Sequence, residues 1–515
     1  MKKALKNAIF YEIYPQSFKD SNADGIGDFK GIIEKLDYIK DMGFTGIWMN
    51  PCFLSPFDDA GYDVEDYYTT APRYGSNEDL KELFDEVHKR GMYIILDLVP
   101  GHTSINCKWF KESKKDEKNE YSDRYIWTNS VWDDCAGIAG ITGSLRGVTE
   151  RNGCCALNFF STQPALNYGF AEITQPWQSA VDSKAAMETR KEIVNIIMFW
   201  LDKGCDGFRV DMAGSLVKAD EEQKETIKLW QDILGKVYEK YPEAIFVSEW
   251  GDPAKSLVAG FDMDFLLHFG PSHYLDLFRI DNPYFSGKGT GDLSKFFDIY
   301  IKNRELTQGK GLICIPSGNH DMPRISYKLD TDHIKLAYAF LMSMPGVPYI
   351  YYGDEIGMRY LNGLTSVEGG YDRTGSRSPM QWDNSQNNGF STASADKLYI
   401  MMDPDVNKPT VEEQLACENS LLNELKKLMA IRKANEVLQE SADIELICAN
   451  EYLLIYKRTL GDNKVLVVIN PSESQCEYSL DLSFGETIYS FNEVCEVKNG
   501  KLIISPCSAS FIQIN

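Results

Sequence analysis

The chain has 515 residues, of which 43% are hydrophobic and 25% are charged, and its formal net charge is −23 at pH 7. That length is too great for one compact core, so two or three domains are expected. The excess of acidic residues argues against nucleic acid or an anionic membrane as a partner, because both require basic patches.

The N-terminus and the cysteines predict a cytoplasmic protein. The first residues are basic, but neither the apolar segment nor the cleavage site of a signal peptide follows them. No apolar run approaches the roughly 20 residues that span a bilayer. The 12 cysteines form no CxxC pair, so we expect free thiols in a reducing compartment. The sequence leaves open whether the protein is a monomer or a homodimer.

Strands and helices alternate through the first hundred residues. Apolar runs predict strands at residues 8–14, 46–49 and 93–99, and helical periodicity predicts helices at 29–42 and 76–90. Residues 103–172 are rich in Lys, Asp, Asn and Gly and show little periodicity. Because that segment is too long for a plain loop, we interpret it as a small domain inserted after the third strand.

Alternation resumes after this inserted domain. The predicted helices lie at residues 184–203, 221–240, 333–344 and 415–434. The predicted strands lie at residues 207–210, 244–248, 261–269, 312–315 and 347–351. The resulting total of eight strands favours an α/β fold of the (β/α)8 barrel type, formed by residues 1–102 and 173–438.

The last part of the chain changes character. Short strands at close spacing are predicted at residues 452–457, 464–469, 476–482 and 501–504. We therefore expect residues 439–515 to form a C-terminal all-β domain, a small β-sandwich.

Three carboxylates follow apolar runs of the predicted barrel. Asp211 and Glu249 come directly after runs that we interpret as buried strands, and Asp321 follows a third run within a few residues. Each of them, taken alone, is more often a surface residue than a catalytic one. Their shared position at the C-terminal ends of different strands is the layout of an active site on a (β/α)8 barrel.

The neighbours of these acids suggest different protonation states. Arg209 lies two residues before Asp211, so in a strand both side chains share one face, and the arginine favours an ionised Asp211. Glu249 stands beside Trp250, and an acid next to an aromatic wall can hold its proton and act as a general acid. An ionised acid paired with a protonated one is the arrangement for glycosidic bond cleavage. A structural salt bridge remains the alternative interpretation of the Arg209–Asp211 pair.

Together with several further segments, these residues resemble the α-amylase family of retaining glycoside hydrolases, closest to its α-glucosidase and oligo-1,6-glucosidase branch. The resemblance implies that Asp211 is the nucleophile, Glu249 the acid/base and Asp321 the stabiliser of the transition state. It extends from about residue 10 to residue 383. The segments that carry it are residues 10–18, 61–63, 97–102, 207–211, 248–250, 319–321, 352–355 and 373–382.

The same resemblance implies a substrate pocket that is closed at one end. Asp59 and Arg373 correspond to a salt bridge that blocks the non-reducing end in family members acting on short substrates, which implies exo-action. Arg377 is a weaker candidate for the same role, and Asp59 can alternatively be a plain loop acid. The other residues expected to contact the sugar are Tyr62, His102, Gln163, Arg209, Met212 and His320.

The loop of residues 20–28 predicts a structural divalent cation. Oxygen-bearing side chains stand at every second position, with Gly25 sixth and the Ile26 carbonyl seventh, as in the first nine positions of an EF-hand loop. The bidentate glutamate at position twelve is missing. An unliganded Asx-rich turn is the alternative. The expected ligands of Ca²⁺ or Mg²⁺ are Asp20, Asn22, Asp24, Ile26 and Asp28.

Four departures from the family pattern limit what can be inferred. Gly101 stands where many amylases have a calcium-ligating Asn, and Gly214 with Ser215 replaces a common Lys-His pair, so a calcium-dependent endo-amylase is disfavoured. Ala165 replaces a usual Asp. Met212 follows the nucleophile, where a smaller residue usually helps to sort α-1,6 from α-1,4 linkages.

The expected function is therefore an exo-acting α-glucosidase on disaccharides or short oligosaccharides. A transglycosylase or isomerase of sucrose, trehalose or maltose is the alternative, because it uses the same covalent intermediate. A non-catalytic sugar-binding or scaffold protein is disfavoured, because all three acids are present.

Overall fold

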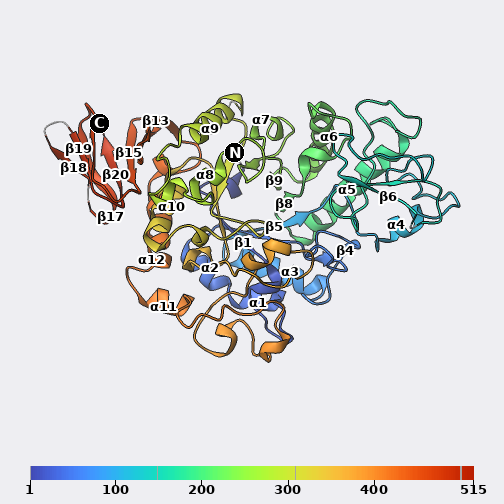
Figure 1. Ribbon diagram of the computed structural model, residues 1–515, viewed down its shortest axis with the longest axis horizontal. Helices are drawn as coiled ribbons and strands as arrows, with labels where there is room; N and C mark the ends of the chain where they lie inside the picture. Colours follow the sequence, from blue (N-terminus) through green and yellow to red (C-terminus); the bar gives the residue numbers. More distant parts are fainter. Residues whose placement is uncertain (1, 148, 308, 494, 499–500, 515) are drawn as a thin grey trace.

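Eight parallel strands close into a barrel, as the sequence predicts, and their order is β1-β12-β11-β10-β9-β8-β5-β2. Strands β1, β5, β8 and β9 are labelled near the centre of Figure 1. The computed structural model describes residues 2–147, 149–307, 309–493, 495–498 and 501–514. The barrel strands are β1 (Phe10–Ile13), β2 (Gly46–Met49), β5 (Tyr93–Leu98), β8 (Gly207–Val210), β9 (Ile245–Ser248), β10 (Met263–Phe265), β11 (Leu312–Pro316) and β12 (Val347–Tyr351).

Helices connect these strands, and their ends follow local sequence signals. Helix α3 begins after a capping box in which Ser76 and Asp79 satisfy each other's backbone N–H groups, and helix α5 ends at Gly204 in the left-handed conformation. Helix α1 (Phe29–Glu34) has six residues. The longer helices are α2 (Leu36–Met42), α3 (Asn77–Lys89), α5 (Lys184–Lys203), α6 (Lys224–Lys240), α9 (Ser294–Thr307), α10 (Thr331–Ser343) and α12 (Leu421–Ala434). The short helices are α4 (Lys108–Ser113), α7 (Pro253–Ser256), α8 (Tyr274–Phe278) and α11 (Val411–Ala416).

Several predicted bounds differ from the structure. The helix predicted at 29–42 is two helices that meet at Lys35, whose backbone is not helical. The strand predicted at 261–269 spans only Met263–Phe265. The helix predicted from residue 415 begins at Leu421, because α11 ends at Ala416 and Ser420 caps a new helix. Helix α9 escaped prediction because most of its buried positions are aromatic, and aromatic residues are typical of strands.

The inserted segment contains little regular structure. Its strands β6 (Gly143–Leu145) and β7 (Cys155–Leu157) form a two-stranded antiparallel sheet. A small apolar cluster supports it, formed by Ile126, Cys135, Ile141, Cys154, Ala156, Ala165 and Phe170. In Figure 1 this segment lies at the right-hand end of the molecule, across the barrel from the C-terminal sheets.

The C-terminal part is all-β, as predicted. Five strands form an antiparallel sheet, and three more form a second sheet. Apolar side chains of both sheets share one core that includes Leu453, Leu466, Leu502 and Ile504. Sequence reasoning missed β13, β17, β18 and β20. The strands are β13 (Asp443–Asn450), β14 (Leu453–Leu460), β15 (Asn463–Asn470), β16 (Cys476–Ser479), β17 (Phe484–Phe491), β18 (Glu496–Lys498), β19 (Lys501–Ile504) and β20 (Ser508–Ile514).

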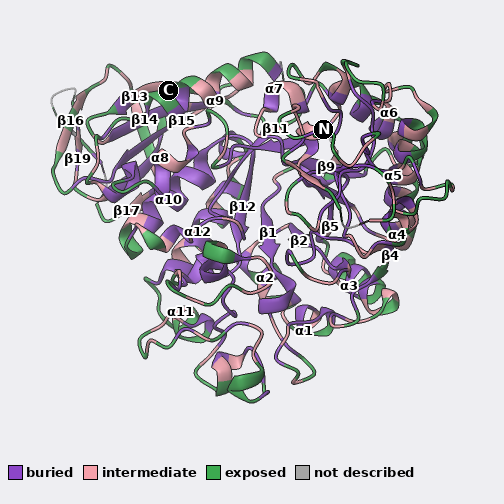
Figure 2. Cartoon of the chain, turned by 45° about the vertical axis from the view of Figure 1, so that its right-hand side comes forward, coloured by how far each residue is buried: buried purple, intermediate pink, exposed green. Residues whose placement is uncertain are grey.

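Burial follows the barrel strands closely (Figure 2). Every residue of β1, β2, β8, β9 and β12 is buried. Two of these strands nevertheless carry charged side chains, Glu12 in β1 and Arg209 in β8, and each is at most 1% exposed. A buried charge requires a partner, so these residues mark where the barrel interior is polar.

Two further sequence expectations concern cysteines and membrane spans. All 12 cysteines are free, and eight of them are buried. Among the residues that the structure describes, no helix combines the length and the apolarity that crossing a membrane requires.

Candidate active site

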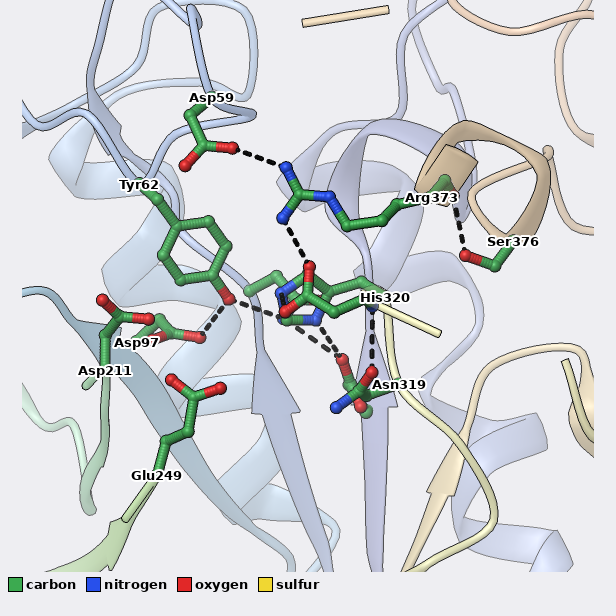
Figure 3. A network of polar contacts seen from close by, with 12 residues as sticks. Asp59, Tyr62, Asp97, Asp211, Glu249, Asn319, His320, Arg373 and Ser376 are labelled. Atoms are coloured by element: carbon green, nitrogen blue, oxygen red, sulfur yellow. Dashed lines mark hydrogen bonds and ion pairs between the residues drawn. The ribbon is translucent and has the colours of Figure 1, made fainter. Parts of the chain in front are cut away.

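A cavity of about 500 Å³ opens where the barrel strands end at their C-terminal side. Side chains from several strand ends point into this space (Figure 3). The residues that line it are Asp59, Tyr62, His102, Phe159, Phe160, Asp211, Met212, Gly214, Ser215, Gln223, Glu249, Trp250, His268, Phe269, Asp321, Tyr371 and Arg373. The three predicted catalytic acids therefore share one cavity.

Asp211 and Glu249 stand on rigid strand ends. The N–H of Asp211 donates to the carbonyl of Leu98 at 2.8 Å, and the N–H of Glu249 donates to the carbonyl of Val210 at 2.9 Å. These bonds extend the barrel ladder by one residue beyond β8 and β9. Both carboxyl groups consequently start from fixed backbone positions, which is what a preorganised site requires.

One guanidinium links three carboxylates beneath the cavity. Nη1 of Arg209 lies 2.9 Å from Oδ1 of Asp97 and 3.0 Å from Oδ1 of Asp211. Its Nη2 lies 2.8 Å from Oε2 of Glu249. Sequence reasoning missed Asp97, although it lies in one of the family segments, because its contact with Arg209 joins two different strands.

The surroundings of Asp211 disfavour its charge. Burial and the Glu249 carboxylate raise the pKa of Asp211 well above its usual range, although Arg209 opposes this. The expectation that Arg209 holds Asp211 ionised is therefore wrong, since one positive charge is divided among three acids. Asp211 in this environment retains its proton at a pH where an isolated aspartic acid has lost its own.

Asp321 has the opposite environment. Its Oδ1 accepts from Nη1 of Arg373 at 2.8 Å and from Nη2 of Arg377 at 3.2 Å, and its Oδ2 lies 3.2 Å from Nε2 of His320. Burial disfavours the charge of Asp321, but these three cations outweigh burial and hold its pKa well below the usual range. Asp321 is therefore a fixed negative charge.

Asp59 and Arg373 form the expected ion pair, with Oδ1 and Nη2 3.0 Å apart (Figure 3). The second oxygen of Asp59 accepts from Nε2 of Gln163 at 2.9 Å. Because Arg373 also binds Asp321, the wall of the cavity and the catalytic acid share one guanidinium. Arg377, the weaker candidate, contacts Asp321 instead of Asp59.

A buried lysine fixes the orientation of His102. Lys218 can only donate, and its Nζ lies 3.0 Å from Oδ1 of Asn158 and 2.7 Å from the carbonyl of Ser215. The amide nitrogen of Asn158 therefore faces Nδ1 of His102 at 3.1 Å. The Nε2–H of His102 is left to donate to the carbonyl of Tyr62 at 2.9 Å. Burial lowers the pKa of His102 to about 4, so this ring is neutral.

The two departures nearest His102 have structural roles. A Cβ on Gly101 would lie 2.7 Å from the amide nitrogen of Asn158, so glycine is what lets Asn158 approach. Ala165 forms an isolated antiparallel bridge with His102 and is fully buried. The inserted domain is thereby joined to the cavity at His102.

Met212 acts through its backbone as well as its side chain. Its φ of 45° is left-handed, and its N–H donates to Oε2 of Glu249 at 3.1 Å. The side chain lines the cavity, and its Sδ lies 3.6 Å from the amide nitrogen of Asn158. The residue after Asp211 thus positions Glu249, which the sequence alone does not indicate.

Three residues predicted to bind substrate do not line the cavity. Gln163, Arg209 and His320 are at most 1% exposed and lie behind the lining, where they contact its carboxylates. Conversely, the aromatic rim formed by Phe159, Phe160 and Tyr371 was missed. No local motif marks that rim, since it joins the inserted domain to the loop after β12.

The loop of residues 20–28 folds back on itself through Asx turns. Oδ1 of Asp20 accepts from the N–H of Asn22 at 2.9 Å, Oδ1 of Asn22 from Asp24 at 2.9 Å, and Oδ1 of Asp24 from Ile26 at 2.9 Å. Within the described ranges of the chain, no group of three or more His, Cys, Asp or Glu side chains converges as a metal site. The oxygen donors are nevertheless of the type that Ca²⁺ and Mg²⁺ prefer.

Comparison with known proteins agrees with this geometry. A model of the α-amylase catalytic domain matches residues 12–441. The chain is 31% identical to the oligo-1,6-glucosidase of Parageobacillus thermoglucosidasius, over 91% of this chain and 90% of that enzyme. It is 32% identical to the glucan 1,6-alpha-glucosidase of Streptococcus pneumoniae, over 99% of this chain and 98% of that enzyme.

A solved structure is similar over the whole length. It is a mutant of isomaltulose synthase from Erwinia rhapontici NX5 in complex with its natural substrate sucrose, with a TM-score of 0.83, 26% identity and coverage of 100% of both chains. The family resemblance of the sequence is thereby confirmed. The chain belongs to the α-amylase family of glycoside hydrolases, and its curated relatives lie in the α-glucosidase branch.

Proposed function

We propose that the protein is a retaining, exo-acting α-glucosidase of disaccharides and short oligosaccharides. The observation that carries the proposal is the binding of Asp211 and Glu249 to one guanidinium, at 3.0 and 2.8 Å. It keeps both acids side by side at the cavity floor. Retaining glycosidases need two carboxyl groups at close range, one as nucleophile and one as acid.

In the first step a carboxylate oxygen of Asp211 attacks the anomeric carbon of the bound glucosyl unit. The glycosidic C–O bond breaks, and Glu249 transfers its proton to the leaving oxygen. The products are a covalent glucosyl ester of Asp211 and a free alcohol, and Glu249 is left ionised. This step requires an ionised Asp211 and a proton on Glu249.

In the second step water attacks the same carbon while Glu249 takes up its proton. The ester bond breaks, α-glucose is released, and Asp211 returns as a carboxylate. Two inversions at one carbon give net retention. Asp321, held ionised by its three cationic neighbours, stabilises the positive charge that the sugar ring develops in both transition states.

The proposed exo-action rests on the wall of the cavity. The Asp59–Arg373 pair is braced by Gln163 on one side and by Asp321 on the other. Because Gln163 and Asp321 hold this ion pair in place, we expect it to limit the substrate to one glucosyl unit beyond the cleaved bond. Gln163, Arg209 and His320 support this arrangement from behind, and Tyr62, His102 and Met212 face the sugar.

The linkage is proposed from the relatives. Two of them are named as 1,6-glucosidases, so we propose α-1,6-linked glucosides as the first substrates. An isomerase that transfers the glucosyl unit to a sugar hydroxyl instead of water is the second candidate, since the sucrose-bound isomaltulose synthase shares the fold over its full length.

A panel of isomaltose, maltose, sucrose and trehalose tests the proposal. We expect release of glucose, fastest from isomaltose, with the α-anomer formed first in proton NMR. Formation of new disaccharides from sucrose without free glucose would support the isomerase. Release of the β-anomer first would contradict the retaining mechanism.

We also propose a structural divalent cation in the loop of residues 20–28, held by Asp20, Asn22, Asp24, Asp28 and the carbonyl of Ile26. Its alternating oxygen donors support this, whereas the Asx turns support the unliganded alternative. A bound ion stabilises the folded state. Thermal unfolding with 5 mM CaCl₂ or MgCl₂ should occur a few degrees higher than with EDTA. Equal melting temperatures with both ions and with EDTA would contradict the proposal, and Asp24→Asn should reduce the difference.

A cytoplasmic location stays a prediction, which the free thiols support.

A further inference from the structure

A carboxylate inside the barrel, that of Glu12 on β1, has no role in the steps above. It is fully buried, and its Oε1 accepts from Nδ2 of Asn50 at 3.2 Å. The same oxygen lies 2.8 Å from Nδ1 of His320. Its Oε2 has no hydrogen-bond partner among the described residues. Burial raises the pKa of Glu12, and His320, the cationic side chain in contact with it, opposes that rise. A charged carboxylate in such a place needs this positive partner.

His320 lies between two carboxylates. Nδ1 faces Glu12, and Nε2 lies 3.2 Å from Oδ2 of Asp321. The contact at Nε2 is an ion pair without a hydrogen bond, and only the doubly protonated ring carries the positive charge that it requires. Although burial lowers the pKa of a histidine, the two acids raise that of His320 to about 9.

The other groups around the ring do not replace Glu12. Tyr62 stacks on the ring with centroids 5.2 Å apart, and Trp48 packs edge-on at 6.0 Å. The amide nitrogen of Asn50, 3.1 Å from Nδ1, is itself a donor.

The other charged side chains near the ring of His320 have their contacts with other groups. Asp97 is paired with Arg209, Arg377 contacts the carbonyl of His320 and the carboxylate of Asp321, and His268 acts on the ring only through space.

We propose that Glu12 is a positioning residue that keeps His320 as an imidazolium and thereby holds a positive charge beside Asp321. The inference rests on the proposed role of Asp321. A neutral His320 would lack the charge that attracts Asp321, and the carboxylate would shift away. The charge of Glu12 on the far side of the ring thereby fixes the geometry of the acid that faces the sugar.

The substitution Glu12→Gln tests this because it keeps the shape and the acceptor oxygen but removes the charge. The titration of His320 is followed by NMR of ¹⁵N-labelled imidazoles, and His320→Gln identifies its signals among the six histidines. In the unmodified protein we expect His320 to stay protonated at pH 8. In Glu12→Gln its pKa should fall by one unit or more, and the alkaline limb of kcat/KM should move down in parallel.

Glu355→Gln is the matched control. Glu355 is another fully buried carboxylate, bonded to the hydroxyls of Tyr11 and Tyr38 at 2.6 and 2.9 Å and without contact to His320. It should leave the titration of His320 unchanged. A fall of equal size in both variants would overturn the inference, because loss of any buried acid would then explain it.

The outcomes separate this inference from the proposed function. An unchanged His320 titration in Glu12→Gln overturns the inference whatever the activity. If Glu12→Gln does not fold, the unmodified protein decides, because a neutral His320 at pH 7 also overturns it. A shifted titration in a protein that cleaves no glucoside would support the inference and refute the proposed function.

Discussion

The two sides of the cavity hold their carboxylates in opposite electrostatic environments. On the β8–β9 side Asp211 and Glu249 share a single guanidinium with Asp97. On the β11 side Asp321 alone is surrounded by two guanidiniums and an imidazole. The first arrangement favours a protonated Asp211, and the second favours an ionised Asp321. Two aspartic acids therefore differ in their protonation because one shares a single cation with two other acids and the other is surrounded by three cations.

Removing the nucleophile should have the largest effect. Asp211→Asn keeps the shape but cannot form the glucosyl ester, so kcat/KM should fall by about 10⁴-fold or more. Steady-state hydrolysis of the best panel substrate measures it. Asp220→Asn, an acid nine residues later outside the cavity lining, serves as the control. Unchanged turnover in Asp211→Asn would refute the assignment.

Weakening the cationic side should shift the pH dependence. Arg373→Gln removes one of the charges that depress the pKa of Asp321, so that pKa rises and the acid limb of kcat/KM moves to higher pH. We also expect a loss of about 10²-fold at the optimum, because the wall at Asp59 opens. Arg359→Gln, which breaks an ion pair with Asp403 away from the cavity, should change neither. An unmoved acid limb in Arg373→Gln would argue that Asp321 does not depend on Arg373.

Crowding Asn158 should have the smallest effect. In Gly101→Ala the new Cβ meets the amide nitrogen at 2.7 Å, so His102 loses its fixed orientation. A displaced contact of this kind lowers kcat/KM by about 10-fold. Gly235→Ala on helix α6 is the control, because nothing lies within 4 Å of its added Cβ, and it should preserve the activity. Equal kinetics in both variants would show that the Asn158–His102 contact is dispensable.

The sequence predicted most of the barrel because each of its strands is an apolar run bounded by loop residues. The predictions of helices and strands were least reliable where a local preference competes with tertiary packing, as in the aromatic-rich α9 and the C-terminal strands with exposed faces. The pocket acids could be placed because each follows such a run. Their partners could not, since the contacts of Asp97, Glu12 and Lys218 join positions far apart in the chain and depend on which strands become neighbours.

The same limit explains the wrong expectation about Asp211. The spacing of Arg209 and Asp211 on one strand correctly indicates a contact. It does not reveal that Asp97 and Glu249 claim the same guanidinium from the neighbouring strands β5 and β9. Electrostatics in a buried site depends on the complete set of neighbours.

The central claim, that Asp211 forms a covalent bond to the sugar, is tested most directly by trapping. A 5-fluoro-α-glucosyl fluoride has a good leaving group and an electron-poor ring, so the ester should accumulate. Mass spectrometry of the digested protein should then locate one fluoroglucosyl group on the peptide that contains Asp211, and Asp211→Asn should abolish it. A label on another residue, or inactivation without any label, would contradict the account.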